Sequence, residues 1–302
     1  MERPYILHLF TPTPQASPFD VNMAADAGYQ LIMPYTGVSL DAISGLTQDA
    51  IFSRGPKGVA RTGIFIGGRD VALAADMAQR AVAAMVPPFV VSVMADPSGA
   101  FTTAAGLVGC VEAALKKHHG TDLAGKRVLL LGGTGTVGRV AAVLCAQSGA
   151  TALISSRHGL GAAQACADDT GKRFGATLHG VAAGDSAGLR ATLADVDVVL
   201  GVAAAGVQVL SAEDRGFAPK LLVAADVNAV PPAGIAGVGV MDNGVPIAGT
   251  KAVGIGALAV GNVKYQVQHR LLLRMREGGK AVNLGFEDAF AMAREVLAEA
   301  KA

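Results

Sequence analysis

The sequence has no tryptophan, only three cysteines and little charge of either sign. Charged residues make up 16% of its 302 residues, and 25 Lys and Arg balance 24 Asp and Glu. A nucleic-acid-binding protein normally carries a basic face, so this balance argues against a nucleic-acid partner. The three cysteines, Cys110, Cys145 and Cys166, are too few and too scattered for a disulfide framework or a thiolate metal site. We therefore expect a protein of a reducing compartment, the cytoplasm.

Long uninterrupted hydrophobic runs are also absent. Although 51% of the residues are hydrophobic, Gly or Pro breaks every run before the roughly 18 residues that a membrane helix needs. The apolar stretch near the N-terminus is too short for a signal peptide. The six histidines show no metal-ligand spacing. We expect neither a membrane partner nor a bound metal.

Short runs rich in β-branched residues alternate with longer alanine-rich helical patterns. The predicted strands are 5–10, 31–34, 63–66, 89–94, 127–131, 152–155, 177–180, 196–200 and 221–224. The predicted helices include 71–85, 101–117, 137–148, 160–174, 262–277 and 286–301. Such alternation predicts an α/β protein with mainly parallel sheets.

The length favours two domains, and the chain suggests where they meet. A long helical pattern ends at Gly120 and a fresh strand begins at 127, while a glycine-rich, irregular segment follows Val230. We predict a first α/β domain from 1–121, completed by the C-terminal helices 262–302, and a second, Rossmann-type domain from 122–261.

The second predicted domain opens with a dinucleotide fingerprint. Strand 127–131 runs into GGTGTVG, in which Gly133, Gly135 and Gly138 satisfy G-x-G-x-x-G before an apolar helix. These glycines serve the tight turn, the approach of a pyrophosphate and the packing of helix on strand. The cofactor-binding residues predicted here are Gly133, Thr134, Gly135, Thr136, Val137 and Gly138.

The end of the next strand predicts which dinucleotide binds. An NAD site usually has an acidic residue there, but this chain has Ser155, Ser156 and Arg157, with no acid before Asp168. Two hydroxyls and a guanidinium suit a 2′-phosphate, and Lys172 could add charge from the following helix. The sequence therefore predicts NADP, with NAD as the weaker alternative.

Residues at the ends of two later strands are also expected near the dinucleotide. Ala203 and Ala204 are small enough for a nicotinamide ribose to pass closely. Asp226 and Asn228 lie where open α/β sheets bind ligands, although loop capping explains this pair too. All four are predicted to bind the cofactor.

The blocks SPFDVNMA, VPPF…ADPSGAFTTAAG, KRVLLLGGTGTVG, PKLLVAADVNAVPPAGI and VGIGALAVGNVKYQ extend over nearly the whole chain. Together they make it resemble the methylene-tetrahydromethanopterin dehydrogenases of methylotrophic bacteria. The resemblance implies an oligomeric, two-domain enzyme that oxidises a methylene-pterin to the methenyl form with NAD(P). The first domain would then bind the pterin.

The resemblance also implies site residues. Phe19 and Asp20 would border the pterin, Lys264 would lie by its reacting carbon, and Gln268, one helical turn further on, would share that site. Asp96, Thr102 and Thr103, which follow a strand of the first domain, are further substrate-binding candidates. Asp96 could equally well cap a helix. Lys264 could be a lysine on the surface of a helix. We predict catalytic roles for Lys264 and Asp20.

Two alternatives to this function stay open. The same architecture could serve a methylene-tetrahydrofolate dehydrogenase, with or without cyclohydrolase activity. The second alternative is a non-catalytic protein that senses NADP. Such a sensor would have little use for polar residues such as Asp20 and Lys264 in its first domain.

Overall fold

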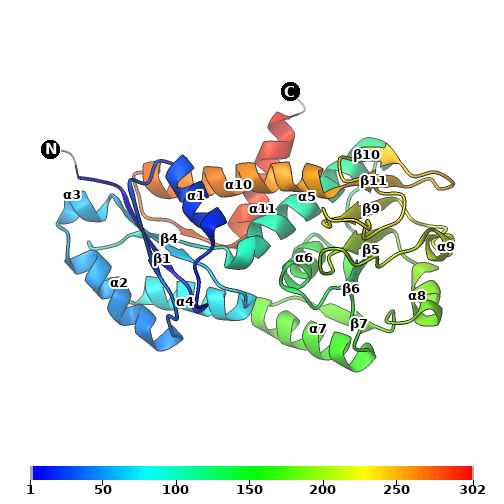
Figure 1. Cartoon of the computed structure of the whole chain (residues 1–302), viewed down its shortest axis with the longest axis horizontal. Coiled ribbons are helices and arrows are strands. Elements are labelled where there is room, and N and C mark those ends of the chain that lie inside the picture. Colours follow the sequence, from blue (N-terminus) through cyan, green and yellow to red (C-terminus); the bar gives the residue numbers. More distant parts are fainter. Residues whose placement is uncertain (1–2, 301–302) are drawn as a thin grey trace. The chain divides into compact units, whose positions relative to one another are not determined.

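The computed structural model describes residues 3–300 and divides the chain into two compact α/β units. The first unit comprises Met1–Thr102 and Tyr265–Met292, and the second comprises Thr103–Lys264 and Ala293–Ala302. Three long helices, α5 (Ala100–His119), α10 (Ala257–Glu277) and α11 (Phe286–Glu299), contain the points of division (Figure 1). We expected boundaries near 121 and 261, where helical patterns or loops end in the sequence. The compact units are divided by tertiary contacts instead, and their limits lie inside the helices.

The first unit has a sheet of five parallel strands in the order β12-β4-β3-β1-β2. Its strands are β1 (Ile6–Phe10), β2 (Leu31–Tyr35), β3 (Thr62–Ile66), β4 (Ser92–Ala95) and β12 (Asn283–Leu284). Its other helical elements are α1 (Pro18–Asp26), η1 (Leu40–Ala42), α2 (Ile43–Phe52), α3 (Pro56–Val59), α4 (Val71–Ala83) and η2 (Pro97–Gly99). The inner strands β3 and β4 are buried at every residue, whereas the edge strand β2 is largely exposed.

The second unit has a sheet of seven strands in the order β10-β11-β9-β8-β5-β6-β7, parallel except for β10. Its strands are β5 (Arg127–Leu131), β6 (Thr151–Ser155), β7 (Leu178–Val181), β8 (Val198–Gly201), β9 (Val223–Asp226), β10 (Asn243–Pro246) and β11 (Val253–Ile255). Its further helices are α6 (Thr136–Gln147), α7 (Leu160–Phe174), α8 (Ser186–Leu193) and α9 (Ala212–Arg215). Read from β7 to β11, this is the doubly wound order of dinucleotide-binding domains, with β10 added at one edge.

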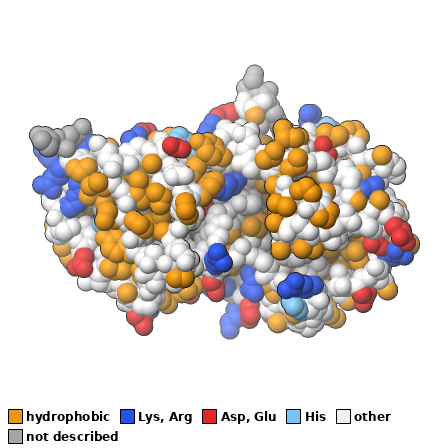
Figure 2. Space-filling model, in the orientation of Figure 1, with side chains coloured by type: hydrophobic (Ala, Val, Ile, Leu, Met, Phe, Trp, Pro, Cys, Tyr) orange, Lys and Arg blue, Asp and Glu red, His pale blue; other side chains and the backbone are white. Residues whose placement is uncertain are grey.

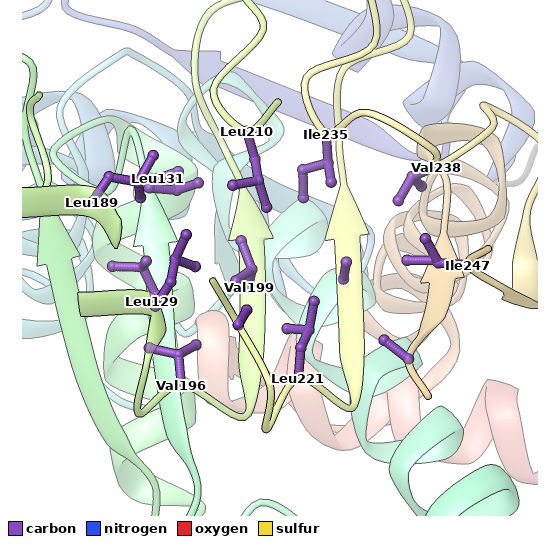
Figure 3. Close-up of a cluster of buried hydrophobic side chains, with 14 of the residues drawn as sticks. Leu129, Leu131, Leu189, Val196, Val199, Leu210, Leu221, Ile235, Val238 and Ile247 are labelled. Carbon is purple, nitrogen blue, oxygen red and sulfur yellow. The ribbon is translucent and has the colours of Figure 1, made fainter. Parts of the chain in front are cut away.

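Both faces of the second sheet are covered. Figure 3 shows one face, where Leu129 and Leu131 of β5 and Val199 of β8 pack with side chains from α8 and from the loops. Residues of opposite parity, such as Val128 and Leu130, are also fully buried, and α6 contacts β5, β6 and β7. Burial on both faces explains why these strands appear as continuous apolar runs in the sequence.

The α/β class and the Rossmann-type second sheet are as predicted from the sequence. The glycine-rich segment after Val230, expected to be irregular, nevertheless contains β10 and β11. Glycine weakens the strand pattern, so the buried strand VGI could not be recognised from its residues.

The helical segment Pro97–His119 is long and apolar enough to cross a membrane by length and composition alone. However, 78% of its most apolar window is buried inside the protein, as in the core helix of a soluble protein.

Candidate functional site

The glycine-rich loop between β5 and α6 has the strand–turn–helix geometry that the fingerprint requires. The residue with positive φ in this loop is Gly132, at +79°, whereas the motif predicted that Gly133 makes the tight turn. A Cβ on Gly132 would lie 2.7 Å from Ala203 Cα, so the loops that follow β5 and β8 touch at this glycine. The tight turn therefore begins one residue before the motif.

The three glycines of the motif have different surroundings. A Cβ on Gly138 would lie 2.6 Å from the Gly133 backbone, and one on Gly133 would lie 2.9 Å from Leu130 O. These two glycines are needed by the fold itself. A Cβ on Gly135, in contrast, would find its nearest neighbour, Gly132 O, at 3.5 Å, which is ordinary contact. The space over Gly135 is thus left open by the protein, as a pyrophosphate site requires.

Helix α6 also holds this loop. Gly135 is its N-cap residue, so the free N–H groups of the first turn lie at the loop. Arg139, in the next turn, donates from Nε to Thr134 O at 3.1 Å and from Nη1 to Thr170 Oγ1 at 3.1 Å. These two bonds connect the loop at the start of α6 to α7 and hold its shape.

An open pocket of about 690 Å³ lies at the carboxyl ends of β5, β6 and β8. In the strand order, β5 is flanked by β6 on one side and β8 on the other, so this is the topological switch point of the sheet. Open α/β sheets bind their ligands at such points. Six predicted residues line the pocket: Thr134, Gly135, Ser155, Arg157, Ala203 and Ala204.

The two serines are less available than predicted. Ser155 and Ser156 are each 3% exposed. Ser155 Oγ donates to Leu130 O at 3.1 Å, and Ser156 Oγ accepts from His158 N at 3.1 Å. Their hydroxyls shape the turn after β6, whereas the side chain of Arg157 is exposed and lines the pocket.

Other predicted cofactor residues lie outside the pocket lining. Thr136, Val137 and Gly138 belong to the first turn of α6. The prediction for Lys172 is corrected, because Lys172 is in the last turn of α7 while the pocket lies at the other end of that helix. At 1.5 Å per residue, the separation from Leu160 along the helix axis is about 18 Å.

Two acidic residues and a histidine that we did not predict also line the pocket: His158, Asp185 and Asp214. His158 could have been found, since it is part of the SSRH sequence. Asp185 follows β7 as the N-cap of α8 and Asp214 belongs to α9, and only the fold brings these two segments to the pocket. A side-chain hydrogen bond from Arg190 holds the pKa of Asp214 below its usual range, and Ser211 adds to this effect.

Asp226 and Asn228 organise the loop after β9. Asp226 is 2% exposed, and its carboxylate accepts from Asn228 N and Ile235 N at 3.0 Å each. Asn228 donates to Pro232 O and accepts from Gly206 N and Val230 N. Both line a smaller hollow of about 140 Å³, separate from the main pocket. These contacts match the loop-capping interpretation, and the direct cofactor contact stays a prediction.

In the first unit, Asp20 and Gln268 form a buried pair. Ser17 is the N-cap of α1, which places Asp20 in the first helical turn, where the helix dipole favours a carboxylate. Gln268 Nε2 donates to Asp20 Oδ1 at 3.0 Å, and the two side chains are 0% and 5% exposed. The neighbouring Phe19 is 45% exposed. The structure thus joins two predicted residues that are far apart in the sequence.

Asp96 and Thr102 are joined in a different way. The Asp96 carboxylate is 0% exposed and accepts from Phe101 N, Thr102 N and Thr102 Oγ1, the last at 2.6 Å. Thr102 is also 0% exposed. The prediction that these two side chains contact the substrate is therefore not supported. They cap the start of α5 instead.

Lys264 and Thr103 belong to the second unit, and both are half-buried. Lys264 precedes Gln268 by four residues on α10, so both side chains leave the same face of that helix. Within the second unit α10 packs closely on α5, because a Cβ on Gly106 would lie 3.2 Å from Val260 O and 3.3 Å from Lys264 N. A glycine in α5 thus sets the position of the Lys264 backbone.

The described residues offer neither a reactive thiol nor a set of metal ligands. Burial raises the pKa values of Cys110 and Cys145 to about 12 and also raises that of Cys166. Residues 3–300 contain no cluster of three or more His, Cys, Asp or Glu side chains that could hold a metal ion.

Comparisons with known proteins agree with this architecture. A family described as "Methylene-tetrahydromethanopterin dehydrogenase, N-terminal" matches residues 18–98. The NAD(P)-dependent methylenetetrahydromethanopterin dehydrogenase of Methylorubrum extorquens is 51% identical over 96% of this chain and 98% of its own. The chain belongs to this family.

A second curated protein and a solved structure are also similar to this chain. The "Bifunctional protein MdtA" of the same organism is 31% identical over 96% of this chain and 98% of its own. The structure of shikimate 5-dehydrogenase from Listeria monocytogenes has a TM-score of 0.51 at 14% identity, covering 97% of this chain and 96% of that one. The likeness to this structure supports the two-unit α/β architecture alone.

Proposed function

We propose that this family member oxidises 5,10-methylene-tetrahydromethanopterin to the methenyl form, with NADP⁺ as hydride acceptor. The observation that carries the proposal is the 51% identity, over nearly the full length of both chains, to an enzyme named for this activity. When bound, the dinucleotide supplies the hydride-accepting carbon, while the protein supplies binding, orientation and electrostatics. NAD is a second acceptor to be tested, because that relative is described as NAD(P)-dependent.

We assign the dinucleotide to the second unit. The open space over Gly135 and the free N–H groups at the start of α6 suit the pyrophosphate. Arg157, exposed on the turn after β6, would bind the 2′-phosphate through its guanidinium group. The short side chains of Ala203 and Ala204 line the pocket and leave room in it for the nicotinamide ribose.

We assign the pterin to the first unit, beside the part of α10 that carries Gln268. The reaction turns a neutral methylene carbon into part of a delocalised cation, so it requires no proton transfer in the chemical step. A carboxylate stabilises such a cation as it develops, and Asp20 is the one we assign to this role. Gln268 holds the Asp20 carboxylate in place, Lys264 binds a polar edge of the pterin, and Phe19 packs on its ring.

We also propose that the protein is cytoplasmic and forms homo-oligomers. The second proposal is supported by the edge strand β2, on which Leu31 and Met33 are 46% and 47% exposed. Figure 2 shows hydrophobic side chains gathered on the first unit. Exposed apolar side chains on a sheet edge are typical of places where another chain binds. Light scattering coupled to size-exclusion chromatography measures the oligomeric state, and replacement of both residues by lysine should lower it.

An initial-rate assay tests the proposed activity. Methylene-tetrahydromethanopterin and methylene-tetrahydrofolate are each supplied with NADP⁺ and with NAD⁺. We expect the highest kcat/KM for the methanopterin with NADP⁺. Activity with the folate alone would retain the fold and overturn the substrate, and inactivity in all four combinations would favour an NADP sensor.

A further inference from the structure

The turn after β6 presents two basic side chains to the main pocket. Arg157 and His158 are adjacent in the sequence, both exposed, and both line the pocket. Arg157 Nε donates to His158 Nε2 at 3.1 Å. The imidazole Nε2 is thus the acceptor of this bond. The bond uses Nε and neither of the two Nη groups of the guanidinium.

The backbone of this turn is fixed. Ser156 Oγ accepts from His158 N at 3.1 Å, and Gly159 N donates to Ser156 O at 3.1 Å. Gly184, from the loop after β7, lies against the same turn, because a Cβ there would lie 2.9 Å from Ser156 O. A fixed backbone leaves His158 only its side-chain rotations for meeting a ligand.

The charged groups that face His158 across the pocket are few. Among the residues that line it, Arg157, Asp185 and Asp214 are the others with ionisable side chains. Asp185 Oδ1 accepts from Gly188 N at 2.8 Å as the N-cap of α8. Asp214 is bonded to Arg190 and Ser211. Both carboxylates are thus directed to other donors, and the basic charge of the pocket comes from the turn after β6.

We propose that His158 is the second cationic ligand of the NADP 2′-phosphate and takes up a proton when that phosphate binds. A 2′-phosphate carries up to two negative charges, of which Arg157 balances one. The proton comes from solvent and enters at Nε2, which then ceases to accept from Arg157 Nε and donates to a phosphate oxygen. This inference rests on the NADP site proposed above and adds to it a dependence of cofactor preference on pH, since histidine changes its charge near neutrality.

Isothermal titration calorimetry on the whole protein tests this, with 2′,5′-ADP and 5′-AMP as probes that differ by the 2′-phosphate. Titrations in two buffers of different ionisation enthalpy give the number of protons taken up. We expect 2′,5′-ADP, but not 5′-AMP, to bind with proton uptake near pH 7.5. The affinity ratio of the two probes should fall about tenfold from pH 6.5 to 8.5 as a charge-assisted hydrogen bond is lost.

His158→Gln is the decisive variant, because glutamine can still accept from Arg157 but cannot become charged. The phosphate itself titrates near pH 6, and this contribution is the same in both proteins. We expect the variant to lose most of the proton uptake and most of the pH dependence of the ratio. His179→Gln, an exposed histidine on β7 that does not line the main pocket, is the matched control and should behave as wild type.

Several results would overturn the proposal. Equal proton uptake by wild type and His158→Gln would exclude the imidazole as the proton acceptor. An affinity lost in His158→Ala but restored in His158→Gln, with an unchanged pH profile, would reduce His158 to a positioning residue for Arg157. Binding of 5′-AMP without any preference for 2′,5′-ADP would remove the 2′-phosphate site. The initial-rate assay tests the proposed methylene-pterin activity independently of these binding experiments.

Discussion

Adding one methyl group to Gly135 tests the cofactor site with little disturbance of the fold. The nearest atoms that the new Cβ would meet are Gly132 O at 3.5 Å and Val202 O at 3.9 Å, both ordinary contacts. The backbone φ of −72° is accessible to alanine. Alanine is a poorer N-cap than glycine but has lower entropy in the unfolded chain, so the free energy of unfolding should change by less than about 1 kcal/mol.

Cofactor binding should respond very differently. If the pyrophosphate lies over Gly135, the methyl group occupies space that the ligand needs. Overpacking typically costs about 1–3 kcal/mol, and a loss of about 2 kcal/mol corresponds to a roughly 30-fold weaker Kd. Titration calorimetry with NADP⁺ measures the Kd, and thermal unfolding without ligand measures the stability.

Gly138→Ala is the matched control, since its Cβ would lie 2.6 Å from the Gly133 backbone and something must move. We expect a stability loss of about 2 kcal/mol or more, equivalent to a Tm lower by about 4–8 °C. A folded Gly135→Ala protein that binds NADP⁺ within threefold of wild type would refute the reasoning. So would a Gly135→Ala protein that is as unstable as Gly138→Ala.

Asp20→Asn should lower kcat about 100-fold, a loss of roughly 2.7 kcal/mol of transition-state stabilisation, with the KM for NADP⁺ unchanged in initial-rate assays. Gly106→Ala should displace the Lys264 backbone by a few tenths of an ångström and lower kcat about threefold to tenfold without weakening NADP⁺ binding. Asp96→Asn should cost about 2–3 kcal/mol of stability in chemical unfolding, because a buried carboxylate with three donors is replaced, while cofactor affinity stays constant. Burial raises the pKa of the Cys110 and Cys145 thiols to about 12, so almost no thiolate exists at pH 8, and Ellman's reagent should label the cysteines only after unfolding. Each expectation fails if its measured parameter is indistinguishable from that of wild type or, for the thiols, if the folded protein is labelled.

Local sequence was sufficient to predict the parallel sheets and the glycine-rich loop between β5 and α6. Parallel strands are buried on both faces, so runs such as RVLLL are apolar at nearly every position and stand out from the alanine-rich helices. The G-x-G-x-x-G spacing can also be recognised locally, because the turn, the approach of a ligand and the packing of the helix all involve residues that are close in the sequence. Sequence could not tell which glycines the fold itself requires and over which one the protein leaves open space. That distinction depends on the atoms that a Cβ would meet.

The partners of the polar residues were decided by tertiary structure alone. Asp20 and Gln268 are 248 positions apart, and their hydrogen bond exists because the second half of α10 belongs to the same unit as α1. Asp96 looked like a ligand residue until its carboxylate was found to bond Phe101 N and Thr102 at the start of α5. Lys172 carries a suitable charge on the correct helix but at the wrong end of it. A sequence specifies which groups can donate, accept or carry charge, and only the folded chain determines which of them meet.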